Sequence, residues 1–170
     1  MAYELALNKL GPVCRIEQLV CFEYPVAASQ KFNPNGASFV YLDANGHITL
    51  ALTATQYLFG WAFSPRQLEG TALSNGYWTS SAVAGTSKLL VAPAACNPGV
   101  LFRVPALTNS AVAARCGECT DLVSVNDGTV QYANLGTNDH DVLLVMALPP
   151  DGDDDSILVA FNPNEVQRDT

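Results

Sequence analysis

Few residues in this chain have the types and spacing that chemistry requires. Cys116-Gly117-Glu118-Cys119 forms a C-x-x-C motif, the spacing found in zinc sites and in redox-active thiol pairs. A structural zinc site needs four ligands, but the sequence offers no second C-x-x-C and no pair of closely spaced histidines. A thioredoxin-like pair needs a βαβ context, which this chain does not offer. We interpret the motif as two thiols in a turn, and keep a small thiol- or zinc-binding protein as an alternative.

Two other polar features resemble functional sites. Residues 151–155 (DGDDD) are dense in acids, but they lack the acidic spacing and the later glutamate of an EF-hand calcium loop. His47 and His140 lie beside expected turns, and neither a G-x-S-x-G motif nor a glycine-rich phosphate-binding loop accompanies them. We therefore expect an acidic hairpin tip, turn histidines, no metal or cofactor, and no enzyme activity.

The composition describes a folded chain with unusually few charges. The 170 residues suit one domain, and 49% of them are hydrophobic, which excludes a disordered chain. Charged residues make up 14%, against roughly 25% in ordinary soluble domains. Part of the surface is therefore expected to be covered by a partner.

The charge is distributed unevenly along the chain. The formal net charge is −8; residues 1–66 carry four basic and four acidic residues, whereas residues 117–170 carry eleven acids and one base. A strongly acidic chain repels phosphate groups, so we expect neither nucleic acid nor an anionic membrane surface as a partner.

The apolar stretch from Tyr41 to Phe63 is not a membrane segment. Ile48, Leu50 and Leu52 alternate with smaller or polar residues, which is the period of a strand. The first residues lack a basic region followed by an apolar run, so we expect no signal peptide. Five cysteines without such a signal indicate a reducing compartment and thiols that are mostly unpaired.

The remaining sequence favours an all-β fold. Short β-branched and aromatic runs lie between Gly, Pro, Asn and Asp residues, as in a compact β-barrel or sandwich of short antiparallel strands. Asn45-Gly46 and Asn126-Asp127-Gly128 predict two tight hairpins. We predict strands at residues 18–24, 38–43, 47–52, 57–63, 87–92, 99–104, 121–125, 129–133, 142–148 and 156–161.

We divide the chain into an N-terminal arm, residues 1–18, and a single β domain, residues 19–170. Long loops are expected at residues 30–36 and 71–87. On alternation, Tyr57, Phe59, Trp61 and Phe63 share one strand face, which we assign to the core. The candidate interface residues are aromatic or leucine side chains in the second loop and in the arm: Tyr77, Trp78, Tyr3, Leu7 and Leu10.

Several strands together resemble the small capsid decoration (cement) proteins of tailed bacteriophages. The matching pattern is a strand ending in an Asp-x-x-Gly turn at Asp43, followed by a Thr/Ala-rich strand and a G-x-A element at Gly60. It continues with the strands at Leu101–Ala106, Asp121–Val125 and Val159–Asn162. The resemblance covers residues 38–165, and residues 1–37 have no counterpart in it.

That resemblance implies a β-barrel-like domain that binds the outside of an assembled icosahedral capsid and stabilises it without an active site. The implied partners are the major capsid protein and further copies of this chain, as a trimer or dimer. The implied location is the exterior of a virion assembled in the host cytoplasm. We expect the neutral half and the arm to contact the lattice, and the acidic hairpins at 137–141 and 151–155 to face solvent.

Other structural and binding roles fit the same composition. Another virion component, such as a head fibre or tail protein, shares the expected features. A carbohydrate-binding β-sandwich, in which surface Trp and Tyr stack on sugars, is a further alternative.

Overall fold

The computed structural model describes residues 11–14, 18–32, 38–52, 57–63, 78–106, 115–125, 130–135, 140–151 and 155–166. In these ranges the chain forms thirteen strands and a 3-10 turn at Ala94–Cys96. The predicted all-β fold is confirmed. The strands are β1 (Gly11–Pro12), β2 (Phe22–Pro25), β3 (Lys31–Phe32), β4 (Ser38–Leu42), β5 (Ile48–Leu50), β6 (Gly60–Ala62), β7 (Trp78–Thr79), β8 (Lys88–Pro93), β9 (Phe102–Pro105), β10 (Cys119–Val125), β11 (Val130–Asn134), β12 (Leu143–Ala147) and β13 (Ser156–Phe161).

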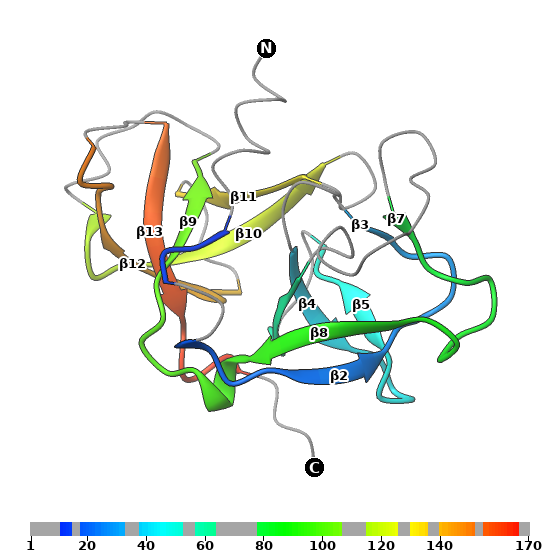
Figure 1. Ribbon diagram of the computed structural model, residues 1–170. Helices are drawn as coiled ribbons and strands as arrows, with labels where there is room; N and C mark the ends of the chain where they lie inside the picture. The colour runs from blue at the N-terminus through cyan, green and yellow to red at the C-terminus, as the bar shows by residue number, and fades with distance from the viewer. Residues whose placement is uncertain are drawn as a thin grey trace.

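Two antiparallel sheets make up most of the fold (Figure 1). The six-stranded sheet has the order β1-β9-β13-β12-β10-β11, and the five-stranded sheet has the order β2-β8-β6-β4-β5. Strands β3 and β7 form a separate two-stranded ladder. One part of the structure curls like half of a barrel.

All ten predicted strands are present, with ends that differ from the prediction by at most four residues. The prediction missed β1, β3 and β7. Each of these strands has two residues, which is too short for a periodic pattern to show. The second predicted loop therefore contains a strand at Trp78–Thr79.

The hairpin at Asn45-Gly46 is confirmed by the pairing of β4 with β5, in which Leu42 lies opposite Ile48. Gly46 has a φ of 75°, a conformation that glycine adopts at little cost. The pairing of β10 with β11 confirms the second hairpin's strands, with Val125 opposite Val130. The turn residues 126–129 lie outside the described residues.

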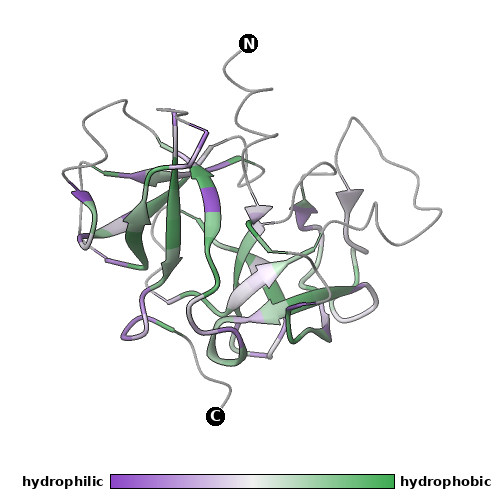
Figure 2. Ribbon diagram, turned by 60° about the vertical axis from the view of Figure 1, so that its left-hand side comes forward, coloured by the Kyte–Doolittle hydropathy of each residue, from purple (hydrophilic) through white to green (hydrophobic). Residues whose placement is uncertain are grey.

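The five-stranded sheet is apolar on both faces because its residues alternate between two cores. Phe39 and Trp61 point into an inter-sheet core shared with the six-stranded sheet. Val40 and Ala62 point into an outer core on the opposite face. Figure 2 shows hydrophobic residues concentrated along the strands, with more hydrophilic residues in the connections.

Four aromatic side chains form the centre of the inter-sheet core. The ring centroids of Phe39 and Trp61 lie 4.9 Å apart, those of Trp61 and Phe102 5.2 Å, and those of Phe102 and Phe161 5.0 Å. All four are nearly or completely buried. Burying one such side chain contributes about 1.5–3 kcal/mol, so this cluster is a major link between the sheets.

The expectation that four aromatic residues share one strand face is wrong. Trp61 and Phe63 belong to the inter-sheet core, but Phe59 belongs to the outer core and Tyr57 is 51% exposed. The physical reason is that regular β6 begins only at Gly60, so strict alternation does not extend back to Tyr57.

Two buried amide side chains form hydrogen bonds with backbone groups that a neighbouring strand would otherwise pair. Gln131, on β11, forms hydrogen bonds with both backbone polar groups of Phe39, on β4, and so joins the two sheets. Asn97, in the turn between β8 and β9, forms the same pair of bonds with Val20.

Part of the predicted N-terminal arm belongs to a sheet. Gly11 and Pro12 form β1, which pairs with Arg103 and Phe102 at the edge of the six-stranded sheet. This pairing includes residues 11–12 in the β fold, which the boundary at residue 18 did not anticipate. Residues 1–10 and 15–17 lie outside the described residues.

Candidate functional site

Three exposed apolar side chains belong to N-terminal residues that lie along β8 and the segment connecting it to β9. Val13 N donates to Leu101 O at 2.9 Å, and Val20 N donates to Asn97 Oδ1 at 2.9 Å. The side chains of Val13, Val20 and Phe22 are 56%, 48% and 49% exposed. We call these three residues the apolar edge.

Asn97 fixes the backbone of Val20 within the apolar edge. Its Nδ2 donates both to Val20 O at 2.9 Å and to Pro93 O at 2.8 Å, and the residue is 5% exposed. Because each such bond contributes about 0.5–1.5 kcal/mol and buried polar groups are costly without partners, the position of Val20 is strongly determined. The fold therefore fixes the backbone that carries the exposed side chain of Val20.

The strand that begins with Phe22 of the apolar edge also carries a proline and a charged residue. β2 is the outermost strand of the five-stranded sheet, and it ends at Pro25, which has no backbone N–H. Glu23 lies 3.9 Å from Lys88 across the strand pair. Proline and charges at a sheet edge disfavour indiscriminate strand pairing, so the apolar edge favours side-chain contact over strand addition.

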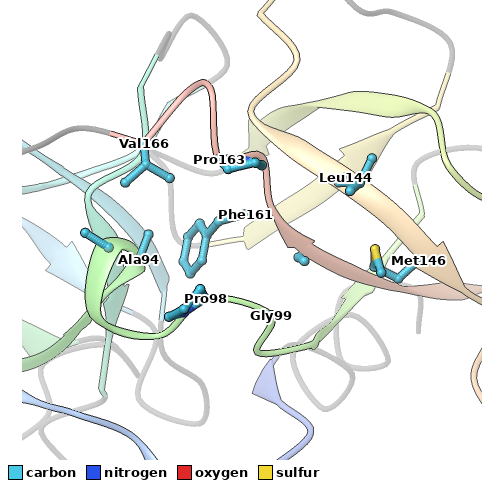
Figure 3. Close-up of a pocket in the computed structure, with 10 residues that line it drawn as sticks. Ala94, Pro98, Gly99, Leu144, Met146, Phe161, Pro163 and Val166 are labelled. Carbon is cyan, nitrogen blue, oxygen red and sulfur yellow. The ribbon is translucent and has the colours of Figure 1, made fainter.

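An apolar groove of about 480 Å³ lies between the six-stranded sheet and the turn after β8 (Figure 3). None of the side chains that line it is ionisable. The lining residues are Ala94, Ala95, Pro98, Gly99, Leu144, Met146, Ala160, Phe161, Pro163 and Val166.

The sheet wall of the groove depends on a β-bulge. Val145 lies opposite Val159 and Ala147 lies opposite Leu158, so Met146 is an extra residue in β12. Bulges redirect side chains and recur beside functional sites. Met146 is 45% exposed, and Figure 3 shows its side chain at one side of the groove.

The opposite wall is held by backbone contacts of the C-terminal residues. Leu58 N donates to Glu165 O at 3.1 Å, and Leu58 forms a bridge with Val166. Asn162 Nδ2 donates to Asp141 O at 2.7 Å. These contacts place Pro163 and Val166 at the groove, whose lining suits an apolar group and offers no acid, base or nucleophile.

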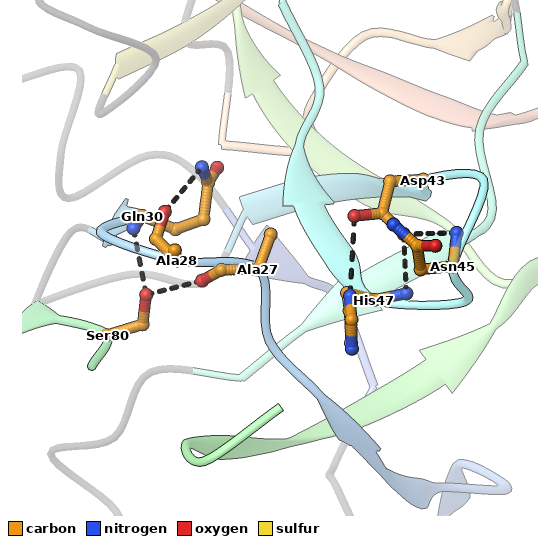
Figure 4. A network of polar contacts seen from close by, with 7 residues as sticks. All are labelled: Ala27, Ala28, Gln30, Asp43, Asn45, His47 and Ser80. Atoms are coloured by element: carbon orange, nitrogen blue, oxygen red, sulfur yellow. Dashed lines mark hydrogen bonds and ion pairs between the residues drawn. The ribbon is translucent and has the colours of Figure 1, made fainter. Parts of the chain in front are cut away.

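The sequence led us to expect Trp78 on the surface, but the structure buries it. It is 7% exposed, belongs to the outer core, and its ring centroid lies 5.6 Å from that of Phe32. Ser80 holds this region, because its Oγ accepts from Gln30 N at 2.8 Å and donates to Ala27 O at 2.7 Å (Figure 4). The side chain of Trp78 is thus buried against residues of its own chain. The other predicted interface residues, Tyr77, Tyr3, Leu7 and Leu10, lie outside the described residues.

The C-x-x-C motif begins in a turn at Cys116 and ends at Cys119, the first residue of β10. Cys116 is exposed and Cys119 is partly buried. Burial raises the pKa of the Cys119 thiol, and the carboxylates of Asp141 and Glu165 raise it further. A raised pKa reduces the thiolate fraction of Cys119, so this thiol is a poor nucleophile at neutral pH.

The polar residues singled out from the sequence have structural contacts. Asp151 forms a double contact with the Arg103 guanidinium, at 2.8 and 3.2 Å. Asp43 Oδ1 accepts from Asn45 N at 2.8 Å and His47 N at 2.9 Å (Figure 4). His140 N donates to the buried carboxylate of Asp121 at 2.8 Å.

Sequence reasoning missed both apolar surfaces. In the predicted strand 18–24, Leu19 is buried while Val20 and Phe22 are exposed, and alternation alone does not say which face turns inward. The run VLLVMAL gives no sign that Met146 is a bulge. No sequence signal for either surface was available beyond the low charge content.

Three further tests bear on function. Within the described residues, no three His, Cys, Asp or Glu side chains are placed to hold a metal ion. The same residues include no helix long and apolar enough to cross a bilayer. No protein-family model, curated protein or solved structure matches the chain.

Proposed function

We propose that this chain is a structural protein that binds the outside of an assembled viral capsid, as a decoration protein. The observation that carries the proposal is the apolar edge: three large apolar side chains, about half exposed, whose backbones are held by Leu101 at Val13, by Asn97 at Val20 and by strand β8 at Phe22. Exposed apolar side chains held in a fixed arrangement are typical of surfaces that bind partners. The resemblance over residues 38–165 supports the choice of a capsid among such partners.

The distribution of exposed apolar residues supports contact through the neutral half. Large exposed apolar side chains of the described residues include five from residues 1–66: Val13, Val20, Phe22, Leu52 and Tyr57. The same part of the chain has balanced charges, so desolvating it costs less than desolvating the acidic part. Asp151, in the other half, is exposed and forms an ion pair with Arg103.

The proposed mechanism is stabilisation by mass action. A protein that binds the assembled lattice but not free coat subunits stabilises the lattice by an amount set by its concentration and dissociation constant. Covering apolar surface contributes about 25 cal/mol per Å², and a specific interface buries on the order of 1,000 Å² or more. Many copies on one shell multiply a modest contribution per site.

The test is the protein's stoichiometry in purified particles. Virions from cells that produce this chain are purified on a density gradient, and its amount relative to the major capsid protein is measured by quantitative mass spectrometry. The proposal predicts a fixed ratio across preparations. Absence from the particles, or an amount that falls with each purification step, would contradict it. A ratio matching the tail instead of the shell would indicate another virion component.

A further inference from the structure

We infer that the apolar groove of one copy binds the N-terminal segment, residues 1–10, of a second copy. The inference concerns contact between copies on the shell and so rests on the proposed function, in which many copies bind one shell. It is tested with no coat protein present, so its failure is separable from failure of capsid binding.

The groove has the size and chemistry of a binding site for apolar side chains. Its volume of about 480 Å³ falls within the range of roughly 300–1,000 Å³ typical of ligand pockets. Phe161 forms its base in Figure 3, between the Pro98 side and the Pro163 side. Ala160, which lies opposite Leu144 in the sheet, is small and leaves room above β13.

The N-terminal segment has a matching composition. Seven of its ten residues are Met, Ala, Tyr or Leu, and its two charges, Glu4 and Lys9, cancel. Tyr3, Leu5 and Leu7 alternate with other residues, so an extended segment presents them on one side. An uncharged groove in an acidic protein suits a segment with no net charge.

Strand β1 runs toward the groove in its C-terminal direction and away from it in its N-terminal direction. Gly11 lies opposite Arg103 and Pro12 opposite Phe102, and Val13 N binds Leu101 O. Moving along β1 from Gly11 to Val13 leads past Leu101 of the neighbouring segment toward Gly99 and the groove. Moving along β1 in the reverse direction leads past Arg103 toward Val104. At Gly11 the N-terminal direction of β1 therefore points away from the groove of the same chain. A second copy is the simpler source of the occupant.

The segment is long enough to bridge two copies. Ten residues span at most about 33–36 Å when extended, which is comparable with the diameter of a small domain. If each copy gives its segment to the other, the two contacts are equivalent under a two-fold axis. A ring of three copies, each binding the next, satisfies the same geometry.

Point variants of the full chain test the contact. Met146→Glu places a charge in the groove at an exposed position, and Leu7→Glu places one in the segment. Sedimentation velocity of the wild type should show a concentration-dependent dimer or trimer. Each variant should raise the dissociation constant at least about tenfold. Val83→Glu, at a 67% exposed residue of the loop before β8, is the matched control and should associate like the wild type.

Mixing the two variants gives the sharpest readout. The Met146→Glu copy keeps a normal segment and the Leu7→Glu copy keeps a normal groove, so one productive contact can form between them. The mixture should associate more strongly than either variant alone. If Met146→Glu fails to fold by circular dichroism, Pro98→Glu at an exposed groove residue replaces it.

Several results would overturn the inference. A wild type that stays monomeric shows that the groove has no occupant from a second copy. Loss of association in only one variant shows that the segment or the groove has a different partner. Two monomeric variants that do not restore association when mixed show that segment and groove do not bind each other.

Discussion

The side chain of Gln131 pairs with the backbone of Phe39 across the two sheets. Gln131 Oε1 accepts from Phe39 N at 2.7 Å, and its Nε2 donates to Phe39 O at 2.9 Å and to Ala51 O at 2.9 Å. Gln131 is fully buried. Phe39 O also accepts from Ala51 N at 3.0 Å, so the groups that depend on the glutamine for a partner are Phe39 N and Ala51 O.

Replacing Gln131 with leucine should destabilise the fold. The change removes three hydrogen bonds to buried backbone groups, and each unsatisfied group costs about 1–3 kcal/mol. We expect the free energy of unfolding in urea to fall by roughly 2–5 kcal/mol. Thr86→Ala, at an exposed loop residue, is the control. Equal unfolding midpoints for both variants would show that this link contributes little.

Replacing Gly60 with alanine should also be destabilising. An added Cβ would lie 2.9 Å from Pro93 Cα and 3.1 Å from the Ala92 carbonyl carbon, both backbone atoms of the paired strand β8. Overpacking of this kind costs typically about 1–3 kcal/mol. Gly11→Ala is the matched control, since its Cβ would meet nothing within 4 Å. Thermal unfolding of both variants checks the prediction, and a Gly60 variant as stable as the Gly11 variant would contradict it.

The first hairpin should weaken in acid through Asp43. Partial burial acts to raise the pKa of Asp43, but hydrogen bonds from the backbone of His47 and Asn45, and the charge of His47, outweigh it. The pKa therefore lies below its ordinary value of 3.8. A depressed folded-state pKa means that this stabilisation is present above pH 3.8 and is lost as the pH falls further.

Asp43→Asn tests this pH dependence. The difference in unfolding free energy between wild type and variant should be largest near neutral pH and should shrink as the pH falls below 3.8. Urea unfolding at several pH values measures it. A difference that stays constant down to pH 2.5 or so would rule out the carboxylate as its source.

The cysteines should react with alkylating agents in an order set by exposure. Cys96 and Cys116 are exposed and should be modified first. Cys21 and Cys119 should react more slowly, because burial raises the pKa of each thiol. Timed alkylation with iodoacetamide, followed by peptide mass spectrometry, gives the order. Faster modification of Cys119 than of Cys116 would contradict an order set by exposure and burial.

The sequence was informative where local patterns determine structure. Runs such as 38–43 and 156–161 carry enough β-branched and aromatic residues to identify a strand, and Asn45-Gly46 identifies its turn. The all-β class and ten strand positions could be predicted on this basis.

The candidate surfaces could not be predicted because they depend on contacts between distant residues. Trp78 is buried by Phe32 and the outer core, which local sequence does not show. The sequence predicts Gln131 to be a polar residue of a half-exposed strand. In the structure it lies in the core, where it accepts a hydrogen bond from the backbone N–H of Phe39 in the other sheet. The bulge at Met146 appears only when β12 is aligned with β13.

The central claim is that this chain acts by binding a capsid through the apolar edge, and co-sedimentation with capsid shells tests it most directly. Shells lacking this chain are mixed with wild type, Phe22→Asp, or the control Val83→Asp, and pelleted with bound protein. We predict saturable binding of wild type and control, and at least about tenfold weaker binding of the folded Phe22→Asp variant. Binding of Phe22→Asp equal to wild type, or no binding of wild type to shells, would contradict the account.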